Sequence, residues 1–428
     1  MAVVAAWKVA LPDRRAWKLQ AAPLTGLFDR HLTPLTLTVL ALGLVLARTL
    51  PGWCRRGSWR QVLVATAVVA LGWGMALAVT RGVDGLDRGS SSPHDYPAVV
   101  AQVDRVGVRS FVDTFTQEPV LRTYPIHVQG HPVGAALLFV GLDRVGLGGP
   151  RGAAAFTLLV SATAVVAVLL AVREVAGADA ARRVAPFLAL MPGVVWWVVS
   201  ADALFATVAA WGIALAVLAT RPGATPRRRA VLALGSGALW GIGVNLSYGL
   251  APLVLVAIVV VVARRCWAVL GWAALGGAAV VAAFAAGGFW WFDGLAATKV
   301  RYDTGVAQYR PAGYFRWLGN PAAFGLAIGP AAWVAVLRVK DRGLALLAGP
   351  ALLAVAIADA TGLSKAEVER IWLPFAPWVL VLAGGLVDRP AGPARRSSSP
   401  GWPALASGLL VVQVVVAVAV ETFVKTPW

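Results

Sequence analysis

The sequence predicts an all-α polytopic membrane protein with about 12–13 transmembrane helices. Of its 428 residues, 59% are apolar and only 14% are charged, whereas charged residues make up about a quarter of a typical soluble domain. Mean hydropathy is +0.74. Apolar runs of about 18 or more residues recur along the chain, and each is long enough to cross the roughly 30 Å hydrocarbon core of a bilayer. A soluble globular protein is therefore excluded.

The apolar runs place the candidate spans. They lie at about 32–50, 60–80, 152–173, 184–199, 201–220, 230–247, 249–263, 268–292, 321–338, 343–361, 371–387 and 403–423. Whether a further short run at about 131–147 crosses the membrane is left open by its length. If all the basic clusters face the cytoplasm, this run dips into the membrane and returns or lies along its surface. The expected organisation is an N-terminal segment (1–31), a main transmembrane module (32–387), a cytoplasmic linker (388–402) and a C-terminal anchor helix (403–428).

Basic residues orient the chain. The net charge of +18 comes from short clusters between the apolar runs, which is the distribution of the positive-inside rule rather than one basic face for nucleic acid. The clusters are Arg55/Arg56/Arg60, Arg182/Arg183, Arg227/Arg228/Arg229, Arg264/Arg265, Arg338/Lys340/Arg342 and Arg389/Arg395/Arg396. Placing them in the cytoplasm leaves three polar stretches on the outer face of a cell membrane, namely 81–132, 293–320 and 362–370.

The first outer loop, 81–132, is the longest polar interruption in the chain. It contains six of the twenty acidic residues and three of the four histidines. Val99, Val103 and Val106 share one helical stripe, which predicts short helices lying in the membrane interface. Because the titratable side chains gather in this loop, we expect the chemistry of the protein to take place there.

Asp95 is the leading catalytic candidate in this loop. It stands at the start of the first interfacial helix, where the helix dipole favours a carboxylate. Such a carboxylate can act as a general base that takes a proton from an acceptor hydroxyl. The simpler interpretation is that Asp95 only caps the helix. Tyr96 follows directly and is expected to contact the substrate.

His127 and His131 are spaced i, i+4, as pairs of metal ligands on helices are. Gly130 and Pro132 argue against a regular helix here. We therefore favour two histidines that hydrogen-bond or contact a phosphate at the mouth of a cavity, and we assign no metal site.

The late turn, 362–370, is the second dense group of charges. Lys365 and Arg370 stand at the outer end of a span, where a guanidinium can hold a phosphate through paired hydrogen bonds. Glu367 and Glu369 are expected to orient these cations or to contact the substrate. The alternative is a surface cluster of charges that caps helix ends.

Two further substrate-binding candidates come from other parts of the chain. Arg310 is one of four basic residues in the loop 293–320, which violates the positive-inside rule and favours binding of an anion; the alternative is that these residues reach lipid headgroups. Asp202 lies at the junction of two apolar runs on the outer side. It either lines the same cavity or caps the next helix.

These features together resemble the GT-C superfamily of integral-membrane glycosyltransferases. The resemblance covers about 60–387 and rests on four features: an acidic residue after an early span, interfacial helices in the first outer loop, His131–Pro132–Val133–Gly134 before the next apolar run, and the Glu–x–Glu–Arg–x–Trp–x–Pro pattern of 367–374. The nearest groups are the bacterial aminoarabinose, protein O-mannosyl, and cell-wall arabinofuranosyl and mannosyl transferases. Two motifs differ from the family pattern: the Asp–Glu pair of several members is absent, because Asp95 precedes Tyr96, and Val133 replaces a proline.

The resemblance implies inverting transfer of a hexosyl or pentosyl group from a polyprenyl-phosphate donor to an extracytoplasmic glycan, lipid or protein. Asp95 would correspond to the catalytic aspartate, with Asp84 and Asp87 less favoured, and Arg370 would contact the donor phosphate. No cofactor is required, and a divalent cation is left open. The rival class is a lipid-linked saccharide transporter or flippase, which should carry ionisable residues in the middle of its spans.

Overall fold

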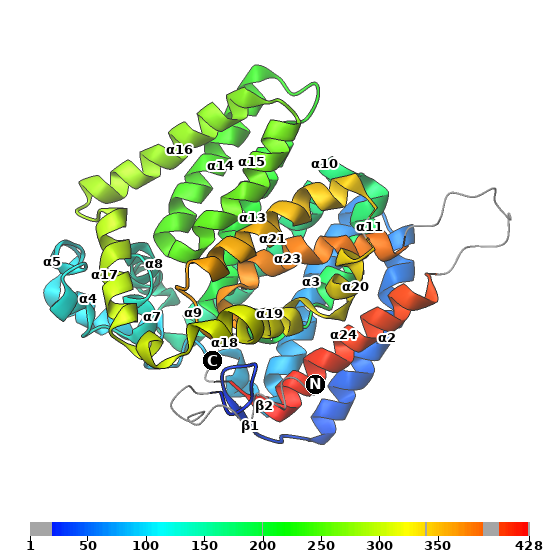
Figure 1. Ribbon diagram of the computed structural model, residues 1–428, viewed down its shortest axis with the longest axis horizontal. Coiled ribbons are helices and arrows are strands. Elements are labelled where there is room, and N and C mark those ends of the chain that lie inside the picture. The colour runs from blue at the N-terminus through cyan, green and yellow to red at the C-terminus, as the bar shows by residue number, and fades with distance from the viewer. Residues whose placement is uncertain (1–18, 199, 339, 388–401, 427–428) are drawn as a thin grey trace, which may run out of the picture.

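The computed structural model describes residues 19–198, 200–338, 340–387 and 402–426, which form a bundle of helices (Figure 1). Within these ranges, nine helical segments are long and apolar enough to cross a membrane. They are α2 (Pro34–Arg56), α3 (Trp59–Ala78), the pair α9 (Gly149–Ser161) and α10 (Ala164–Ala176), α13 (Ala201–Ala219), α14 (Pro226–Leu246), α16 (Trp267–Ala286), α21 (Arg342–Ala360), the segment Val368–Val387 with α22 (Val368–Ile371) and α23 (Ala376–Leu380), and α24 (Ala404–Phe423). The expected all-α polytopic architecture is confirmed, and the chain is a multi-pass membrane protein.

Three of the expected spans do not form a helical segment long enough to cross a membrane, which accounts for the difference between nine segments and the twelve apolar runs. The run 184–199 is divided between α11 (Ala178–Ala189) and α12 (Val194–Trp197). The run 321–338 is divided between α19 (Asn320–Ile328) and α20 (Pro330–Val336), and 249–263 begins as a 3-10 turn before α15 (Val254–Ala263). The breaks fall at Pro192 and at Gly329–Pro330, where Gly329 has a φ of 82°, and Pro252 lies in the 3-10 turn. A proline lacks a backbone N–H and disfavours a helical conformation in the residue before it. Hydropathy detects the apolar run but not this interruption.

The remaining α-helices and the two strands are short and mostly belong to the polar stretches. They are α4 (Val100–Val106), α5 (Val108–Thr114), α6 (Glu118–Leu121), α7 (Ile126–Gln129), α8 (Val133–Leu142), α17 (Trp291–Asp303), α18 (Ala312–Tyr314), and the strands β1 (Leu27–Phe28) and β2 (Val424–Lys425). The strands pair antiparallel, so the N-terminal segment is joined to the end of α24. Of the expected linker 388–402, residues 388–401 lie outside the described residues.

The short run at 131–147 does not cross the bundle. Its helix α8 has ten residues, which corresponds to about 15 Å, or half the hydrocarbon core. Gly134 in its first turn lies against α14 so closely that a Cβ there would be 2.4 Å from the carbonyl oxygen of Asn245. This contact holds α8, and the histidine that precedes it, against the bundle.

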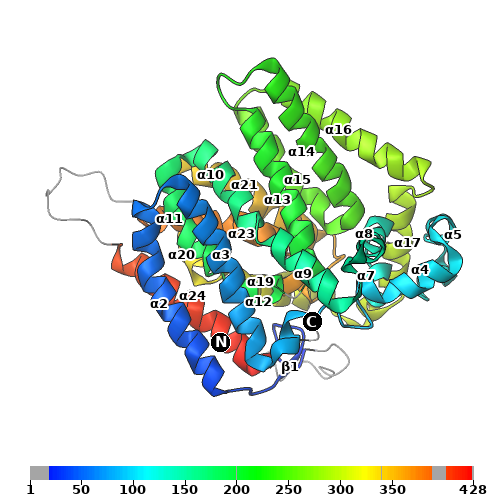
Figure 2. The ribbon, with the colours of Figure 1, turned by 180° about the vertical axis from the view of Figure 1, so that it is seen from behind.

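The bundle has two chemically distinct ends. At one, which we call the basic end, Arg182 donates to the carbonyls of Cys54 and Gly57, both at 2.7 Å, and Arg183 donates to Gly384 at 3.1 Å. At the other, which we call the site end, the three polar stretches meet. Figure 2 shows α4, α7 and α17 grouped there. Several interhelical loops therefore pack together around arginines at the basic end, away from the polar stretches.

Candidate active site

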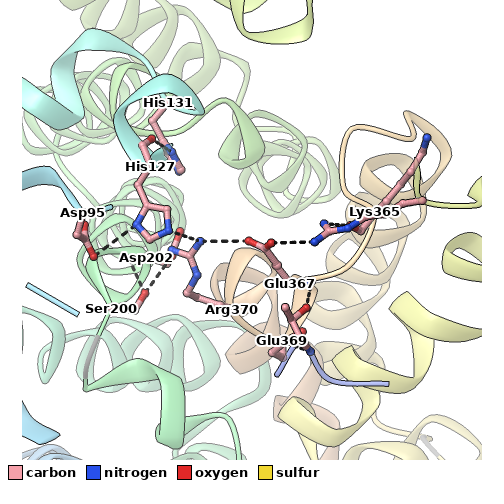
Figure 3. Close-up of polar contacts among 11 residues, drawn as sticks. Asp95, His127, His131, Ser200, Asp202, Lys365, Glu367, Glu369 and Arg370 are labelled. Carbon is pink, nitrogen blue, oxygen red and sulfur yellow. Dashed lines mark hydrogen bonds and ion pairs between the residues drawn. The ribbon is translucent and has the colours of Figure 1, made fainter. Parts of the chain in front are cut away.

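Asp95 has a separate partner for each carboxylate oxygen. Its Oδ1 accepts a hydrogen bond of 2.7 Å from the Tyr96 N–H and so caps the 3-10 turn Tyr96–Val99. Its Oδ2 lies 3.5 Å from Nδ1 of His127 (Figure 3). Burial by itself would raise the pKa of the Asp95 carboxyl, but His127, the Tyr96 N–H and Arg370 together lower that pKa below its usual value. Asp95 is therefore both a helix cap and an ionised carboxylate directed at the neighbouring groups.

His127 connects Asp95 to Arg370. Its backbone N–H donates to the carbonyl of His94 at 3.0 Å, which joins α7 to the segment just before Asp95. On the ring, Nε2 lies 3.5 Å from Nη2 of Arg370. Because a guanidinium only donates, this geometry favours the tautomer with a lone pair on Nε2 and the proton on Nδ1, facing Asp95.

Arg370 and Asp202 form a buried ion pair. Nη1 of Arg370 donates to Oδ2 of Asp202 at 2.6 Å, and the two side chains are only 4% and 5% exposed. The hydroxyl of Ser200 donates to the same carboxylate oxygen at 2.9 Å and accepts from the Asp202 N–H at 3.0 Å, so Ser200 caps α13. A buried charge pair needs such additional hydrogen bonds to compensate for lost hydration.

The late turn is held by three consecutive backbone N–H groups. Those of Lys365, Ala366 and Glu367 donate to the side-chain oxygens of Tyr302 (2.8 Å), Asn320 (3.2 Å) and Thr25 (3.1 Å), respectively. Ala366 and Glu367 have φ values of 75° and 65°, a left-handed conformation that costs roughly 1–3 kcal/mol for a residue other than glycine. Three separate segments of the chain therefore impose the shape of this turn.

The other charged candidates around Arg370 point in different directions. Glu367 bridges two arginines, with Oε1 at 3.3 Å from Nη2 of Arg310 and Oε2 at 3.9 Å from Nη2 of Arg370. Glu369 is fully buried and faces the N-terminal segment, where its Oε1 accepts from the Thr25 N–H at 3.0 Å. The Lys365 ammonium donates to the carbonyl of Ala307 at 3.0 Å and extends away from Arg370, as Figure 3 shows.

His131 and Tyr96 pack behind His127. Nδ1 of His131 donates to the carbonyl of His127 at 2.8 Å, and its ring makes an edge contact with Tyr96. Burial lowers the pKa of His131 to about 4, so the ring is neutral at physiological pH. His127 and His131 thus do not converge as a pair of ligands. Among the described residues, no group of three or more His, Cys, Asp or Glu side chains is placed to hold a metal.

The second polar stretch closes over the first loop. Nε of Arg301 donates to Oε1 of Gln129 at 2.7 Å, and Gln129 in turn donates to the carbonyl of Tyr124 at 2.6 Å. Arg122 donates to the hydroxyl of Thr304 at 2.7 Å. These contacts dock α17 onto the loop beside His127.

All ten sequence-predicted site residues lie at the site end, but they do not share one contact network. Asp95, His127, Arg370, Asp202, Glu367 and Arg310 form a continuous chain of contacts. Tyr96 and His131 pack beside it, and Lys365 and Glu369 hold other segments. Sequence reasoning missed Thr25, Asn320 and Tyr302 as partners of the turn. Their sequence neighbourhoods carry no local signal, because each contact joins positions far apart in the chain.

Most of the buried charged side chains lie at the site end. In the described part of the chain, six charged side chains are buried, and five of them are Asp95, Asp202, Arg310, Glu369 and Arg370. The sixth, Glu421, lies near the end of α24 beside Arg81. The fold and the site therefore define a multi-pass helical membrane protein with an ionic centre built at one end of its helices.

Comparisons with known proteins add little beyond this class. No protein-family model matches the chain, and no curated protein matches it. Among solved structures, it matches crystal structures of ArnT from Cupriavidus metallidurans, in the apo state with a TM-score of 0.47 and bound to undecaprenyl phosphate with a TM-score of 0.45. Each is 19% identical, and the match covers 78% of this chain and 60% of the ArnT chain.

Proposed function

We propose that the protein is a GT-C-type glycosyltransferase that moves a sugar from a polyprenyl-phosphate donor to an extracytoplasmic acceptor, with inversion at the anomeric carbon. The observation that carries the proposal is the chain of contacts from Asp95 through His127 to Arg370. It places an ionised carboxylate and a buried cation in one site, 3.5 Å on either side of a histidine ring. A base and an anion-binding group are the two functions that this transfer needs.

The reaction is a single displacement. The acceptor oxygen forms a bond to the anomeric carbon as the bond between that carbon and the phosphate oxygen breaks, and Asp95 takes the acceptor proton. The Nδ1–H of His127 supports the negative charge of Asp95 before the transfer. Because one displacement replaces one bond from the opposite side, the configuration inverts. A positioned base contributes about 10²–10⁴-fold to such a rate.

Arg370 and Arg310 neutralise the leaving phosphate. Both are buried, and both face the Glu367 carboxylate. Fixed charges in a site with little water act more strongly than they do in bulk solvent. Lys365 lies further out, where its ammonium holds the loop 293–320 by the carbonyl of Ala307. We place the site end on the outside of the membrane, because arginines between the spans, such as Arg182, Arg183 and Arg264, lie at the basic end.

The location of the buried charges favours the enzyme over a lipid-linked saccharide transporter. A transporter is expected to carry ionisable groups near the middle of the bilayer. In the described residues, Asp202 lies in the first turn of α13, Arg370 in the first turns of the span Val368–Val387, and Glu421 near the end of α24. These groups lie at helix ends, which suits chemistry at a membrane surface.

A direct test compares the purified protein with the variants Asp95→Asn and Asp84→Asn on a panel of polyprenyl-phosphate sugars. Asparagine keeps an oxygen for the Tyr96 N–H but cannot take a proton, so transfer should fall by about 10²-fold or more. Asp84 is exposed, and its variant should keep wild-type activity. Undiminished transfer by Asp95→Asn would exclude Asp95 as the base. Donor-dependent lipid movement without transfer would instead identify a transporter.

A further inference from the structure

Glu367 occupies an unusual position between two buried arginines. The Arg310 and Arg370 side chains are only 3% and 4% exposed, whereas the Glu367 side chain is 25% exposed. The carboxylate therefore lies on the more solvent-exposed side of the pair. Its two oxygens face the two Nη2 atoms at 3.3 and 3.9 Å, both longer than the 2.7–2.9 Å of a strong charged hydrogen bond. The Glu367 carboxylate thus bridges Arg310 and Arg370 without making a short hydrogen bond to either.

The two arginines differ in their other partners. Arg370 is already paired with Asp202. Arg310 donates to the carbonyl of Lys365 and to Glu367, and its Nε is buried with no hydrogen-bond partner among the described residues. Arg310 therefore has an unused donor in a site where its main counter-charge is Glu367. A group with more oxygens and more negative charge would satisfy it better.

The backbone around Glu367 is fixed, but its side chain is held less firmly. The N–H groups of Lys365, Ala366 and Glu367 are each held by a different segment, so the turn keeps its shape if the carboxylate leaves. Within the described part of the chain, the Glu367 carboxylate is held by its two arginine pairs. Rotation of this side chain toward solvent would open the space between Arg310 and Arg370 without moving the turn.

We propose that the Glu367 carboxylate fills a phosphate-binding site between Arg310 and Arg370 and rotates out when a phosphate group enters. This rests on the proposed function, since the phosphate would be that of the lipid donor. A phosphate carries up to two negative charges and three acceptor oxygens, enough to bridge both guanidinium groups. A site that Glu367 fills about nine-tenths of the time binds about tenfold more weakly than an open one. The Glu367 carboxylate therefore competes with the donor phosphate for this site and weakens donor binding.

The test measures the thermal unfolding midpoint of the purified protein and its Glu367→Gln variant, with and without inorganic phosphate. Without phosphate, the variant should unfold at a lower temperature, because two buried arginines lose their shared counter-charge. Phosphate should restore the variant and have a much smaller effect on the wild type. In the double variant Glu367→Gln/Arg310→Gln, the phosphate response should disappear. Equal responses in wild type and Glu367→Gln would overturn the proposal.

Glu174 provides a matched control at the basic end. Its carboxylate also bridges two arginines, at 3.6 Å from Arg264 and 4.0 Å from Arg221. Arg221 is largely exposed, and Arg264 has further partners in Thr220 and a carbonyl. Glu174→Gln should therefore gain little from phosphate. A gain as large as that of Glu367→Gln would mean that removing any bridging carboxylate has this effect, and the proposal would fail.

A second arm separates this inference from the proposed function. Binding of a short-chain polyprenyl phosphate is measured against the corresponding polyprenol, and Glu367→Gln should bind the phosphate lipid about tenfold more tightly. Weaker binding would make Glu367 a direct ligand of the donor and overturn the proposal.

If inorganic phosphate restores the variant but the phosphate lipid does not bind, the anion site stands and the lipid-donor function fails. If Glu367→Gln does not fold, Glu367→Asp, which keeps the charge but is too short to bridge both arginines, allows the same comparison.

Discussion

Arg370 donates a 2.6 Å hydrogen bond to Asp202, a residue 168 positions earlier in the chain. The contact joins the first turn of α13 to the late turn and sets where the guanidinium lies relative to His127 and Glu367. The Arg370–Asp202 pair therefore contributes both to the stability of the bundle and to the geometry of the candidate site. Substitutions can separate its effect on stability from its effect on activity.

Removing one member of this pair should destabilise the protein strongly. Asp202→Ala leaves the Arg370 charge buried without its main partner, and breaking a buried pair in this way costs about 3–5 kcal/mol. Replacing both residues by apolar ones, as in Asp202→Leu/Arg370→Met, should recover most of that stability while sugar transfer stays absent. Unfolding midpoints in detergent and transfer rates on the same preparations would check both. A single variant as stable as the wild type would contradict the buried-pair description.

Gly134 should be sensitive to the smallest possible substitution. In Gly134→Ala, the new Cβ would meet the carbonyl oxygen of Asn245 at 2.4 Å, and since that atom belongs to the backbone, α8 must move. The expected cost is about 1–3 kcal/mol, with a loss of activity because His131 precedes α8. A Cβ added at Gly141 in the same helix would have no neighbour within 4 Å among the described residues. Gly141→Ala should therefore leave stability unchanged or raise it slightly.

Thr25 is expected to position the late turn from the N-terminal segment. Thr25→Val keeps the shape of the side chain but removes the oxygen that accepts from the Glu367 N–H. A buried N–H left without a partner costs about 1–3 kcal/mol. Hydrogen exchange at the Glu367 amide should accelerate, and donor binding should weaken. Thr25→Ser, which keeps the hydroxyl, should behave as the wild type; if both variants do so, the N-terminal segment does not hold the turn.

His131 should make the fold sensitive to mild acid. Its pKa is about 4 in the folded protein against an ordinary value of 6.5, so the unfolded chain binds the proton more readily. Stability is therefore full above about pH 6.5 and falls as the pH drops toward 4. Between about pH 7 and pH 5 the loss should be on the order of 1–2 kcal/mol. His131→Asn should reduce this loss, while His94→Asn, at an exposed position, should not. An unchanged pH profile in His131→Asn would refute this assignment.

Much of the fold follows from local sequence. The apolar runs predict most of the long helices, and the stripe of the first loop predicts the burial of Val99 and Val103, which are both inaccessible. Val106 is 55% exposed instead, because α4 ends at Gly107, whose φ of 81° turns the chain away. Local pattern thus describes each helix until a backbone feature interrupts it.

The sequence predicted which residues belong to the candidate site, but it did not predict which of them contact one another. Asp95, His127 and Arg370 stood out because charged groups are rare in so apolar a chain, and costly to bury without a partner. The sequence did not predict which cation pairs with which carboxylate, because Arg370 could have paired with Glu367 alone rather than with Asp202. Lys365 resembled Arg370 in the sequence, yet its ammonium lies against the carbonyl of Ala307.

By itself, then, the sequence determined that this is a multi-pass helical membrane protein with its titratable side chains in three polar stretches. Hydropathy and charge are properties of single residues and short windows, so these results require no knowledge of packing. Only the tertiary structure decided that Thr25 reaches Glu369 across 344 positions and that Glu367 lies between Arg310 and Arg370. Such contacts depend on which helix faces pack together, and in a chain of many similar apolar helices that choice is not encoded by any local pattern.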